Sequence, residues 1–132
     1  MDHLRKRLGR DEGFTLIELL IVIVIIGILL AIAVPSYLGF KDRANNRAAE
    51  SDLREAIPSA EAFYSDNGTY SGMKFTSLQN IDSGISTAVG VASAAPTSYC
   101  LTATIGGKIW SVKGPGATWF KTVDCSGSAQ SP

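Results

Sequence analysis

The distribution of apolar residues changes sharply at Pro35. Before it, residues 14–34 form an apolar run in which Thr15 and Glu18 are the polar exceptions. At about 1.5 Å per helical residue, these 21 residues extend roughly 30 Å, which is the thickness of a bilayer core. The pattern therefore predicts a helix that can span a membrane.

After Pro35, apolar or small residues recur at steps of three and four, with charged residues between them. This spacing predicts that the helix continues as an amphipathic helix to about residue 64. The residues on its predicted apolar face are Tyr37, Phe40, Ala44, Ala48, Leu53, Ile57, Ala60 and Tyr64. Glu50 and Arg54 are placed for an ion pair at i and i+4. Pro58 is expected to kink or interrupt the helix near its end.

The rest of the chain predicts a small antiparallel sheet. Residues 65–72 have turn chemistry that should end the helix, and residues 73–98 are interpreted as a connecting loop with a short helix. Three β-rich runs follow at 99–105, 108–113 and 117–123, and Gly-Gly between the first two indicates a hairpin. The fold class is therefore α+β, with the second half of the helix covering one face of the sheet. The candidate contacts from the sheet are Leu101, Trp110, Val112, Trp119 and Phe120, and both tryptophans are assigned to packing or to a subunit interface.

Composition argues against catalysis. The only histidine is His3, and the chain shows no nucleophile with a base, no phosphate loop and no metal-ligand set. We therefore predict no enzymatic activity, no catalytic residue, no cofactor and no metal. If residues 1–13 are removed, 8 basic and 9 acidic residues remain, so the net charge of −1 gives no support for nucleic acid as the main partner.

The charge around the apolar run predicts both its orientation and a partner for its acid. A basic flank, formed by Arg5, Lys6, Arg7 and Arg10, favours a cytoplasmic N-terminus and an extracytoplasmic C-terminal part. Glu18 needs a cation, because an acid within a membrane helix is costly and usually paired. No basic residue lies between Arg10 and Lys41. Cleavage after Gly13 would create an amino group on Phe14, one helical turn from Glu18, and this pair could also form between neighbouring molecules.

The sequence Gly13-Phe14-Thr15-Leu16-Ile17-Glu18-Leu19-Leu20-Ile21-Val22 resembles the class III signal of type IV pilins and pseudopilins. The resemblance implies that a prepilin peptidase cuts after Gly13 and methylates Phe14. It also implies that Glu18 neutralises the N-terminus of an adjacent subunit. Gly27 and Pro35 agree with the family pattern and would be the points where the helix bends or melts during fibre packing.

Two cysteines, Cys100 and Cys125, lie beyond the predicted membrane segment, in a compartment where disulfides persist. A bridge between them would close a loop of about 26 residues and stabilise the fold by roughly 3–4 kcal/mol. It would resemble the C-terminal disulfide loop of type IV pilins. Two free thiols are the alternative.

The resemblance implies a division into a leader (1–13), a membrane and filament-core helix (14–35), an amphipathic helix (36–64), a connecting loop (65–98) and a sheet with the disulfide region (99–132). The predicted function is a structural subunit of a homo-oligomeric helical filament. Before assembly, the helix of this subunit is expected to lie in the cytoplasmic membrane, surrounded by membrane lipid. Inner-membrane assembly machinery is then expected to move the subunit into an extracellular fibre. The fibre could serve motility, adhesion, secretion or nucleic-acid capture.

Three alternatives remain at this point. The chain could be a pseudopilin of a type II secretion or DNA-uptake system. It could be a binding module on an uncleaved single-span anchor. An ordinary secretory signal with cleavage before Val34 is the third, although the apolar run is longer than such signals need.

Overall fold

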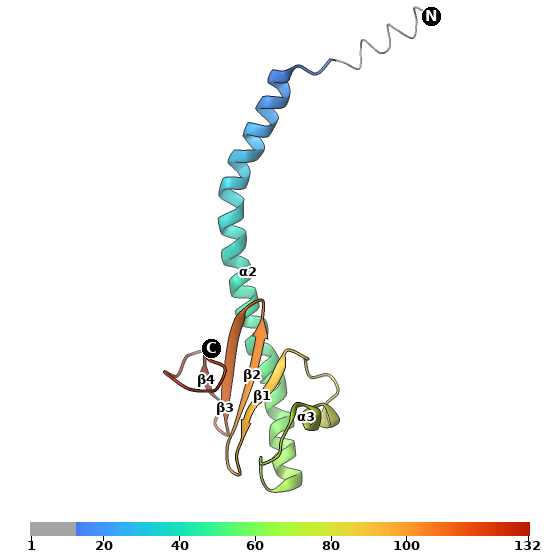
Figure 1. Ribbon diagram of the computed structural model, residues 1–132, viewed down its shortest axis with the longest axis vertical. Coiled ribbons are helices and arrows are strands. Elements are labelled where there is room, and N and C mark those ends of the chain that lie inside the picture. Colours follow the sequence, from blue (N-terminus) through green and yellow to red (C-terminus); the bar gives the residue numbers. More distant parts are fainter. Residues whose placement is uncertain (1–12) are drawn as a thin grey trace, which may run out of the picture. The chain divides into compact units, whose positions relative to one another are not determined.

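The computed structural model describes residues 13–132, so the basic flank, His3 and all but the last residue of the predicted leader lie outside the described residues. Its elements are α2 (Leu16–Asn67), α3 (Phe75–Ile81), β1 (Val89–Ala94), β2 (Tyr99–Ile105), β3 (Lys108–Gly114) and β4 (Thr118–Phe120) (Figure 1). The chain divides into two compact units, with the boundary after Phe40. The predicted class, a long helix and a small antiparallel sheet, is confirmed.

In the first unit, every described residue is exposed. Its large apolar side chains keep between 47% and 87% of their surface accessible. By its length and composition, helix α2 is long and apolar enough to cross a membrane. The helix continues through Gly27 and Pro35. Next to the proline, the Ser36 hydroxyl donates a hydrogen bond to the Ile32 carbonyl at 3.4 Å, and the predicted bending role of Gly27 and Pro35 stays a prediction.

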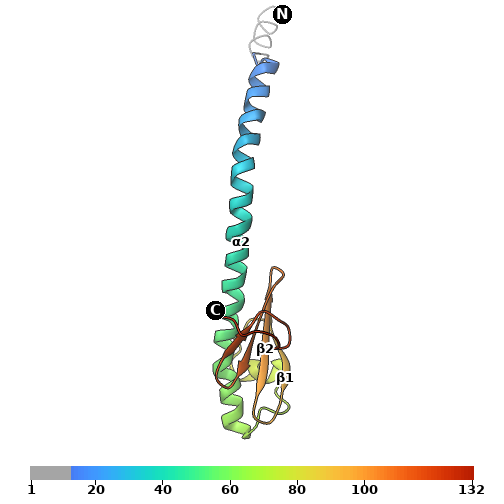
Figure 2. The same cartoon turned by 90° about the vertical axis from the view of Figure 1, so that its left-hand side faces the viewer.

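In the second unit, the C-terminal part of α2 lies along one face of a four-stranded antiparallel sheet (Figures 1 and 2). The strand order is β1-β2-β3-β4, so each strand pairs with its neighbour in the sequence. The predicted strand 99–105 is confirmed, β3 extends one residue further than expected, and the third predicted strand shortens to Thr118–Phe120. The region 65–98, interpreted as a connecting loop, contains both α3 and the unpredicted strand β1.

The core of this unit lies between α2 and the sheet. Four of the five predicted sheet contacts, Leu101, Trp110, Val112 and Trp119, are in the core cluster. Phe120 is buried outside that cluster, and it pairs across the strands with Ser111.

The face that α2 buries differs partly from the predicted one. Leu53 and Ala60 are fully buried, as expected, but the other fully buried apolar positions are Ala49 and Ala56. The predicted Tyr64 remains 39% exposed. Alanine side chains allow the sheet to approach the helix backbone closely, so packing against the sheet, rather than the largest side chains, selects the buried face.

Helix α2 is not interrupted at Pro58 and runs on to Asn67. Gly68 then takes a left-handed conformation with φ of 70°, and its N–H donates to the Tyr64 carbonyl at 2.7 Å. This is a common way to end a helix, because glycine adopts positive φ without steric cost. The turn predicted to follow the helix is therefore present, a few residues later than expected.

The β2–β3 hairpin contacts α2 at three successive places. Gly106 lies against the Asn45 side chain, which occupies the space that a Cβ atom on Gly106 would need. The Lys108 ammonium is 3.3 Å from the Asp42 carboxylate, and the Trp110 indole N–H donates to the Asn46 side chain at 2.9 Å. These contacts fix the hairpin on the first turns of α2 in this unit.

Candidate functional site

The start of α2 brings together the residues predicted for cleavage and assembly. Gly13 and Phe14 precede the helix, and Phe14 is 78% exposed. Glu18 lies in the first helical turn. The structure therefore places the predicted cleavage junction and the predicted assembly acid at one end of the first unit.

Glu18 forms a reciprocal cap with Thr15. The Thr15 N–H donates to Glu18 Oε2 at 3.2 Å, and the Glu18 N–H donates to the Thr15 hydroxyl oxygen at 3.3 Å. This arrangement is a capping box, in which two backbone N–H groups that lack helical partners are satisfied by side chains. The Thr-x-x-Glu spacing is visible in the sequence and is typical of a capping box, but the prediction rested only on the charge of Glu18 and missed this capping role.

The capping box leaves part of the carboxylate available. Within residues 13–132, Oε2 of Glu18 has a hydrogen-bond partner and Oε1 has none. The cap also holds the carboxylate at the N-terminal end of its own helix. A cation approaching that end would therefore meet a positioned oxygen, whereas the pairing with a neighbour's amine stays a prediction.

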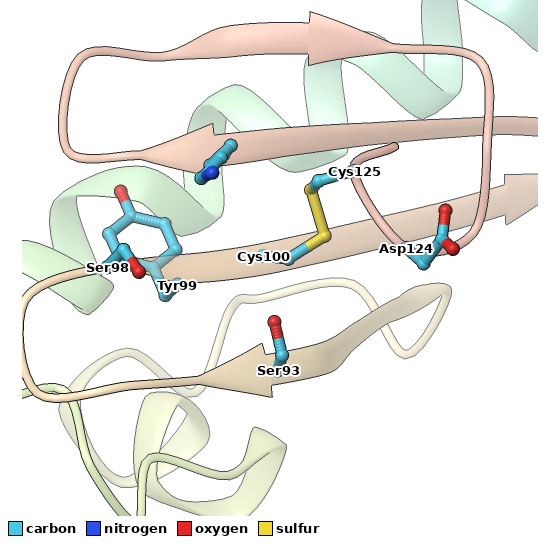
Figure 3. A pocket seen from close by; sticks show the side chains of 7 residues that line it. Ser93, Ser98, Tyr99, Cys100, Asp124 and Cys125 are labelled. Atoms are coloured by element: carbon cyan, nitrogen blue, oxygen red, sulfur yellow. A yellow bond between two sulfur atoms is a disulfide. The ribbon is translucent and has the colours of Figure 1, made fainter. Parts of the chain in front are cut away.

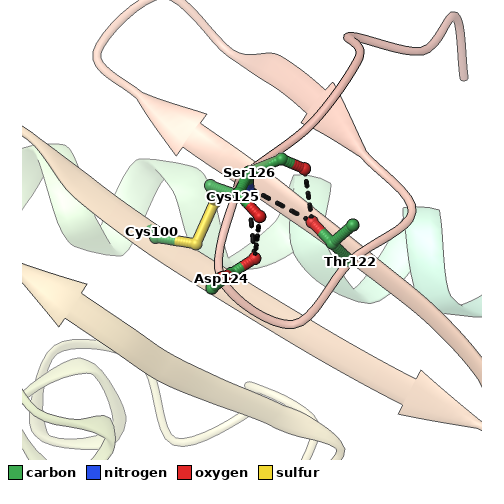
Figure 4. Close-up of a disulfide and its surroundings, with 5 residues drawn as sticks. All are labelled: Cys100, Thr122, Asp124, Cys125 and Ser126. Atoms are coloured by element: carbon green, nitrogen blue, oxygen red, sulfur yellow. Dashed lines mark hydrogen bonds between the residues drawn. A yellow bond between two sulfur atoms is a disulfide. The ribbon is translucent and has the colours of Figure 1, made fainter.

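The second unit contains the predicted disulfide. Cys100 and Cys125 are bonded, with their Cα atoms 5.9 Å apart, so the alternative of two free thiols is excluded in this structure (Figure 4). The loop around Cys125 has its own hydrogen bonds: the Ser126 hydroxyl donates to Asp124 at 2.5 Å, and the Thr122 hydroxyl donates to the Ser126 carbonyl at 2.9 Å. The bond from Ser126 holds the pKa of Asp124 below its usual value.

A polar recess of about 160 Å³ lies beside this disulfide (Figure 3). Its lining includes Ser93, Ser98, Lys113 and Asp124. The recess offers hydroxyl groups and two opposite charges, but no histidine or free thiol that would act as a base or nucleophile. Among residues 13–132, no group of three potential metal ligands lies close together.

An acid and two tyrosines link α2 to the sheet. Glu61 accepts hydrogen bonds from the Tyr70 hydroxyl at 2.8 Å and the Tyr99 hydroxyl at 3.0 Å. Burial, followed by the bond to Glu61, raises the pKa of Tyr70 to about 12 and also raises the pKa of Tyr99. Sequence reasoning missed this cluster, because no local pattern indicates that Glu61 meets a residue 38 positions later.

Comparison with known proteins identifies the family. The family model described as the prokaryotic N-terminal methylation motif matches residues 8–34. The type IV wide pilus major component of Thermus thermophilus is 35% identical, and the match covers 90% of this chain and 93% of that protein. The chain belongs to the type IV pilin family.

Two further relatives show how the similarity is distributed. The type IV narrow pilus major component of Thermus thermophilus is 42% identical to this pilin, over 54% of this chain and 74% of that protein. The type II secretion system core protein G of Pectobacterium carotovorum is 38% identical, over 46% of this chain and 39% of that protein. The similarity to a pilus component thus extends through nearly the whole pilin, whereas the similarity to the secretion protein covers less than half.

Proposed function

We propose that this pilin is the structural subunit of a type IV pilus-like filament, processed by cleavage after Gly13 and methylation of Phe14. The main observation behind this proposal is that the first unit is an exposed apolar helix with Glu18 in the capping box at its start. The match to a methylation motif over residues 8–34 and the near full-length similarity to a wide pilus major component support it.

The apolar helix requires a cover that the single chain does not provide. Sixteen large apolar side chains between Phe14 and Val34 are exposed, each at 47% or more. Full burial of such a side chain is worth about 1.5–3 kcal/mol, so exposure of all sixteen to water is strongly unfavourable. In our proposal, membrane lipid covers this surface before assembly and the helices of other copies cover it in the filament.

Glu18 gives the assembled helices their register. After cleavage, the amino group of Phe14 carries a positive charge, and Oε1 of Glu18 on a neighbouring copy is positioned to accept it. Such a pair, buried among apolar side chains, would favour the one axial offset that brings both charges together. An unpaired carboxylate there would be costly, so other offsets are disfavoured.

Processing and assembly imply defined partners and locations. A prepilin peptidase removes the leader, and inner-membrane machinery moves the subunit from the cytoplasmic membrane into an extracellular filament. The basic flank before Gly13 keeps the N-terminus in the cytoplasm until cleavage. The Cys100–Cys125 disulfide supports an extracytoplasmic second unit, because disulfides persist in oxidising compartments.

The capping box allows an experiment that separates the charge of Glu18 from its cap. Glu18→Gln keeps a side chain that can accept the Thr15 N–H, but it removes the charge. Thr15→Ala removes the cap and keeps the charge. Sheared surface filaments are compared with total cellular pilin by immunoblot, and the N-terminal residue is identified by mass spectrometry.

If the charge sets the register, Glu18→Gln should be cleaved and inserted yet largely absent from filaments, whereas Thr15→Ala should still assemble. Wild-type yields of Glu18→Gln filaments would reject the pairing. Recovery of the wild-type chain from filaments with its first thirteen residues still present would reject the proposed processing.

A pseudopilin of a secretion apparatus is the second candidate, and the similarity to core protein G favours it over part of the chain. We prefer the pilus subunit because the similarity to the wide pilus component extends through the second unit.

A further inference from the structure

The charged side chains of α2 in the second unit are separated into two stripes. At 3.6 residues per turn, Arg43, Arg47 and Arg54 point within about 40° of one another. Asp52, Glu55 and Asp66 form another group that spans about 60°. The two groups lie about 125° apart around the helix axis, one on each side of the face that packs on the sheet. We call them the basic stripe and the acidic stripe.

The basic stripe continues onto the sheet. The Lys121 ammonium lies 4.9 Å from the centre of the Trp110 ring, and the Arg54 guanidinium lies 5.5 Å from the centre of the Trp119 ring. With Arg43 and Arg47, Lys121 lines a recess of about 270 Å³. Two of the four cations, Arg54 and Lys121, are therefore held in place by contacts with buried aromatic rings.

Two carboxylates, Glu50 and Glu61, lie on the same side of α2 as the basic stripe, and both already have partners. Glu61 accepts hydrogen bonds from the Tyr70 and Tyr99 hydroxyls. Glu50 is 5% exposed, and its Oε2 lies 2.9 Å from the Arg47 guanidinium. The expected pair between Glu50 and Arg54 is not present, because Arg54 lies over Trp119 instead. Four cations and two acids leave the basic stripe with a net charge of about +2.

The acidic stripe has no partner inside the described unit. Asp52, Glu55 and Asp66 take part in none of the ion pairs or side-chain hydrogen bonds found among residues 13–132. Asp66 is also unfavourable where it stands, since it lies in the last turn of α2, which has no basic residue. A negative charge there faces the negative end of the helix dipole. The isolated unit thus gives no stabilising role to these three acids.

We propose that the basic stripe of one subunit binds the acidic stripe of a second copy of this chain. The two stripes carry charge of opposite sign, and they lie on different sides of α2. A contact between two unlike surfaces is heterologous, and it leaves a free stripe of each kind on the outer copies. Repetition of such a contact gives an open helical assembly instead of a closed dimer. The inference rests on the proposed filament and adds to it a contact between the second units.

The stripes also determine how neighbouring copies are staggered. The acidic stripe is centred about eleven residues after the basic stripe, roughly 16 Å further along the helix axis. In parallel copies, the subunit that contributes its acids must therefore be displaced towards the N-terminal end of the subunit that contributes its arginines. A contact with a fixed stagger repeats in one direction along a fibre.

Charge reversal in the full-length chain tests the proposal. One variant carries Arg43→Glu with Arg54→Glu, a second carries Glu55→Lys with Asp66→Lys, and a third carries all four changes. All four side chains are exposed. The matched control reverses two exposed cations outside both stripes, Lys74→Glu with Lys113→Glu. Filament yield is measured by shearing and immunoblot, and the Cys100–Cys125 bond is checked on a non-reducing gel.

We expect each stripe reversal to reduce filament yield by about tenfold or more, because like charges would then face each other. The fourfold variant restores opposite charges on the two stripes and should recover most of the yield, and the control should match the wild type. Wild-type yield in both stripe reversals, or a fourfold variant as deficient as either of them, would overturn the proposal. Failure of the proposed function would give a different result from failure of the stripe contact alone, because the wild-type chain itself would then be missing from filaments. In that case the inference about the two stripes would fail as well.

A second measurement does not depend on assembly yield. Chains carrying Arg43→Cys are expressed together with chains carrying Glu55→Cys, and filaments are oxidised. A cross-linked pair that contains one chain of each kind supports the contact. A cross-link no stronger than that formed between chains carrying Lys74→Cys and Glu55→Cys would refute it.

Discussion

The contribution of the disulfide to the stability of the second unit can be worked out from its loop. Cys100 and Cys125 are 25 positions apart in the sequence. In the chain-entropy model, a crosslink over such a loop lowers the entropy of the unfolded chain by about 12 cal/mol/K, which corresponds to about 3.5 kcal/mol at 25 °C. The double substitution Cys100→Ser with Cys125→Ser should therefore remove most of this stabilisation.

The expected change in melting temperature follows from the size of the unit. Residues 41–132 form one compact unit. At about 2.1 cal/mol/K per residue, the entropy of unfolding for 92 residues is roughly 190 cal/mol/K, so a loss of 3.5 kcal/mol lowers Tm by about 18 °C. Both tryptophans, Trp110 and Trp119, are buried in the core of this unit. Their fluorescence in the full-length protein in detergent therefore reports on this unit alone.

Reductant provides the control for this experiment. It should lower the Tm of the wild type by a similar amount and leave the double variant unchanged. Hydrogen exchange should also locate the effect, because the Gln130 N–H donates to the Trp119 carbonyl at 2.8 Å within the segment that the disulfide fastens. A variant that melts within about 5 °C of the wild type would refute the reasoning.

Two further outcomes are expected of the second unit. Leu53→Ala should lower the unfolding free energy by about 2–5 kcal/mol, because Leu53 is fully buried, whereas Ile81→Ala at a 41% exposed position should have a much smaller effect in the same denaturant titration. The pKa of Tyr70 is about 12 in the folded chain and 10.0 when unperturbed, so the folded chain binds more protons between these values and unfolding becomes easier as pH rises from 10 to 12. Tyr70→Phe should weaken this dependence in melts recorded across that range, and an equally steep loss in the variant would contradict the assignment.

The elements with a strong local pattern could be predicted from the sequence. The apolar run and the three- and four-residue spacing after it predicted α2 to within a few residues at each end. Strands β2 and β3 were predicted almost to their ends, because β-branched and aromatic residues flank Gly106-Gly107. Strand β1 has the sequence Val-Gly-Val-Ala-Ser-Ala, whose small residues carry little β preference, and it is held by pairing with β2.

The candidate site was predicted only in part. Gly13, Phe14 and Glu18 were identified by their resemblance to the class III signal, and the structure places them together at the start of α2. The pairing of Arg47 with Glu50 could not be predicted, because Glu50 has two basic neighbours at helical spacing, Arg47 and Arg54. In the structure Arg54 lies over the Trp119 ring, so Arg47 pairs with Glu50. The choice of ion-pair partner for Glu50 therefore depends on Trp119, which is more than sixty residues further along the chain.

The order of the strands affects how the second unit folds. Each strand of the sheet pairs with the next one in the sequence, and only residues 95–98, 106–107 and 115–117 separate them. Closing such short loops costs little entropy, and sheets built from local contacts form quickly. The sheet can therefore assemble early in folding and, with the Trp119–Gln130 bridge, bring the two thiols together itself. Oxidation would then lock a structure that already exists, so the oxidant need not select the pairing.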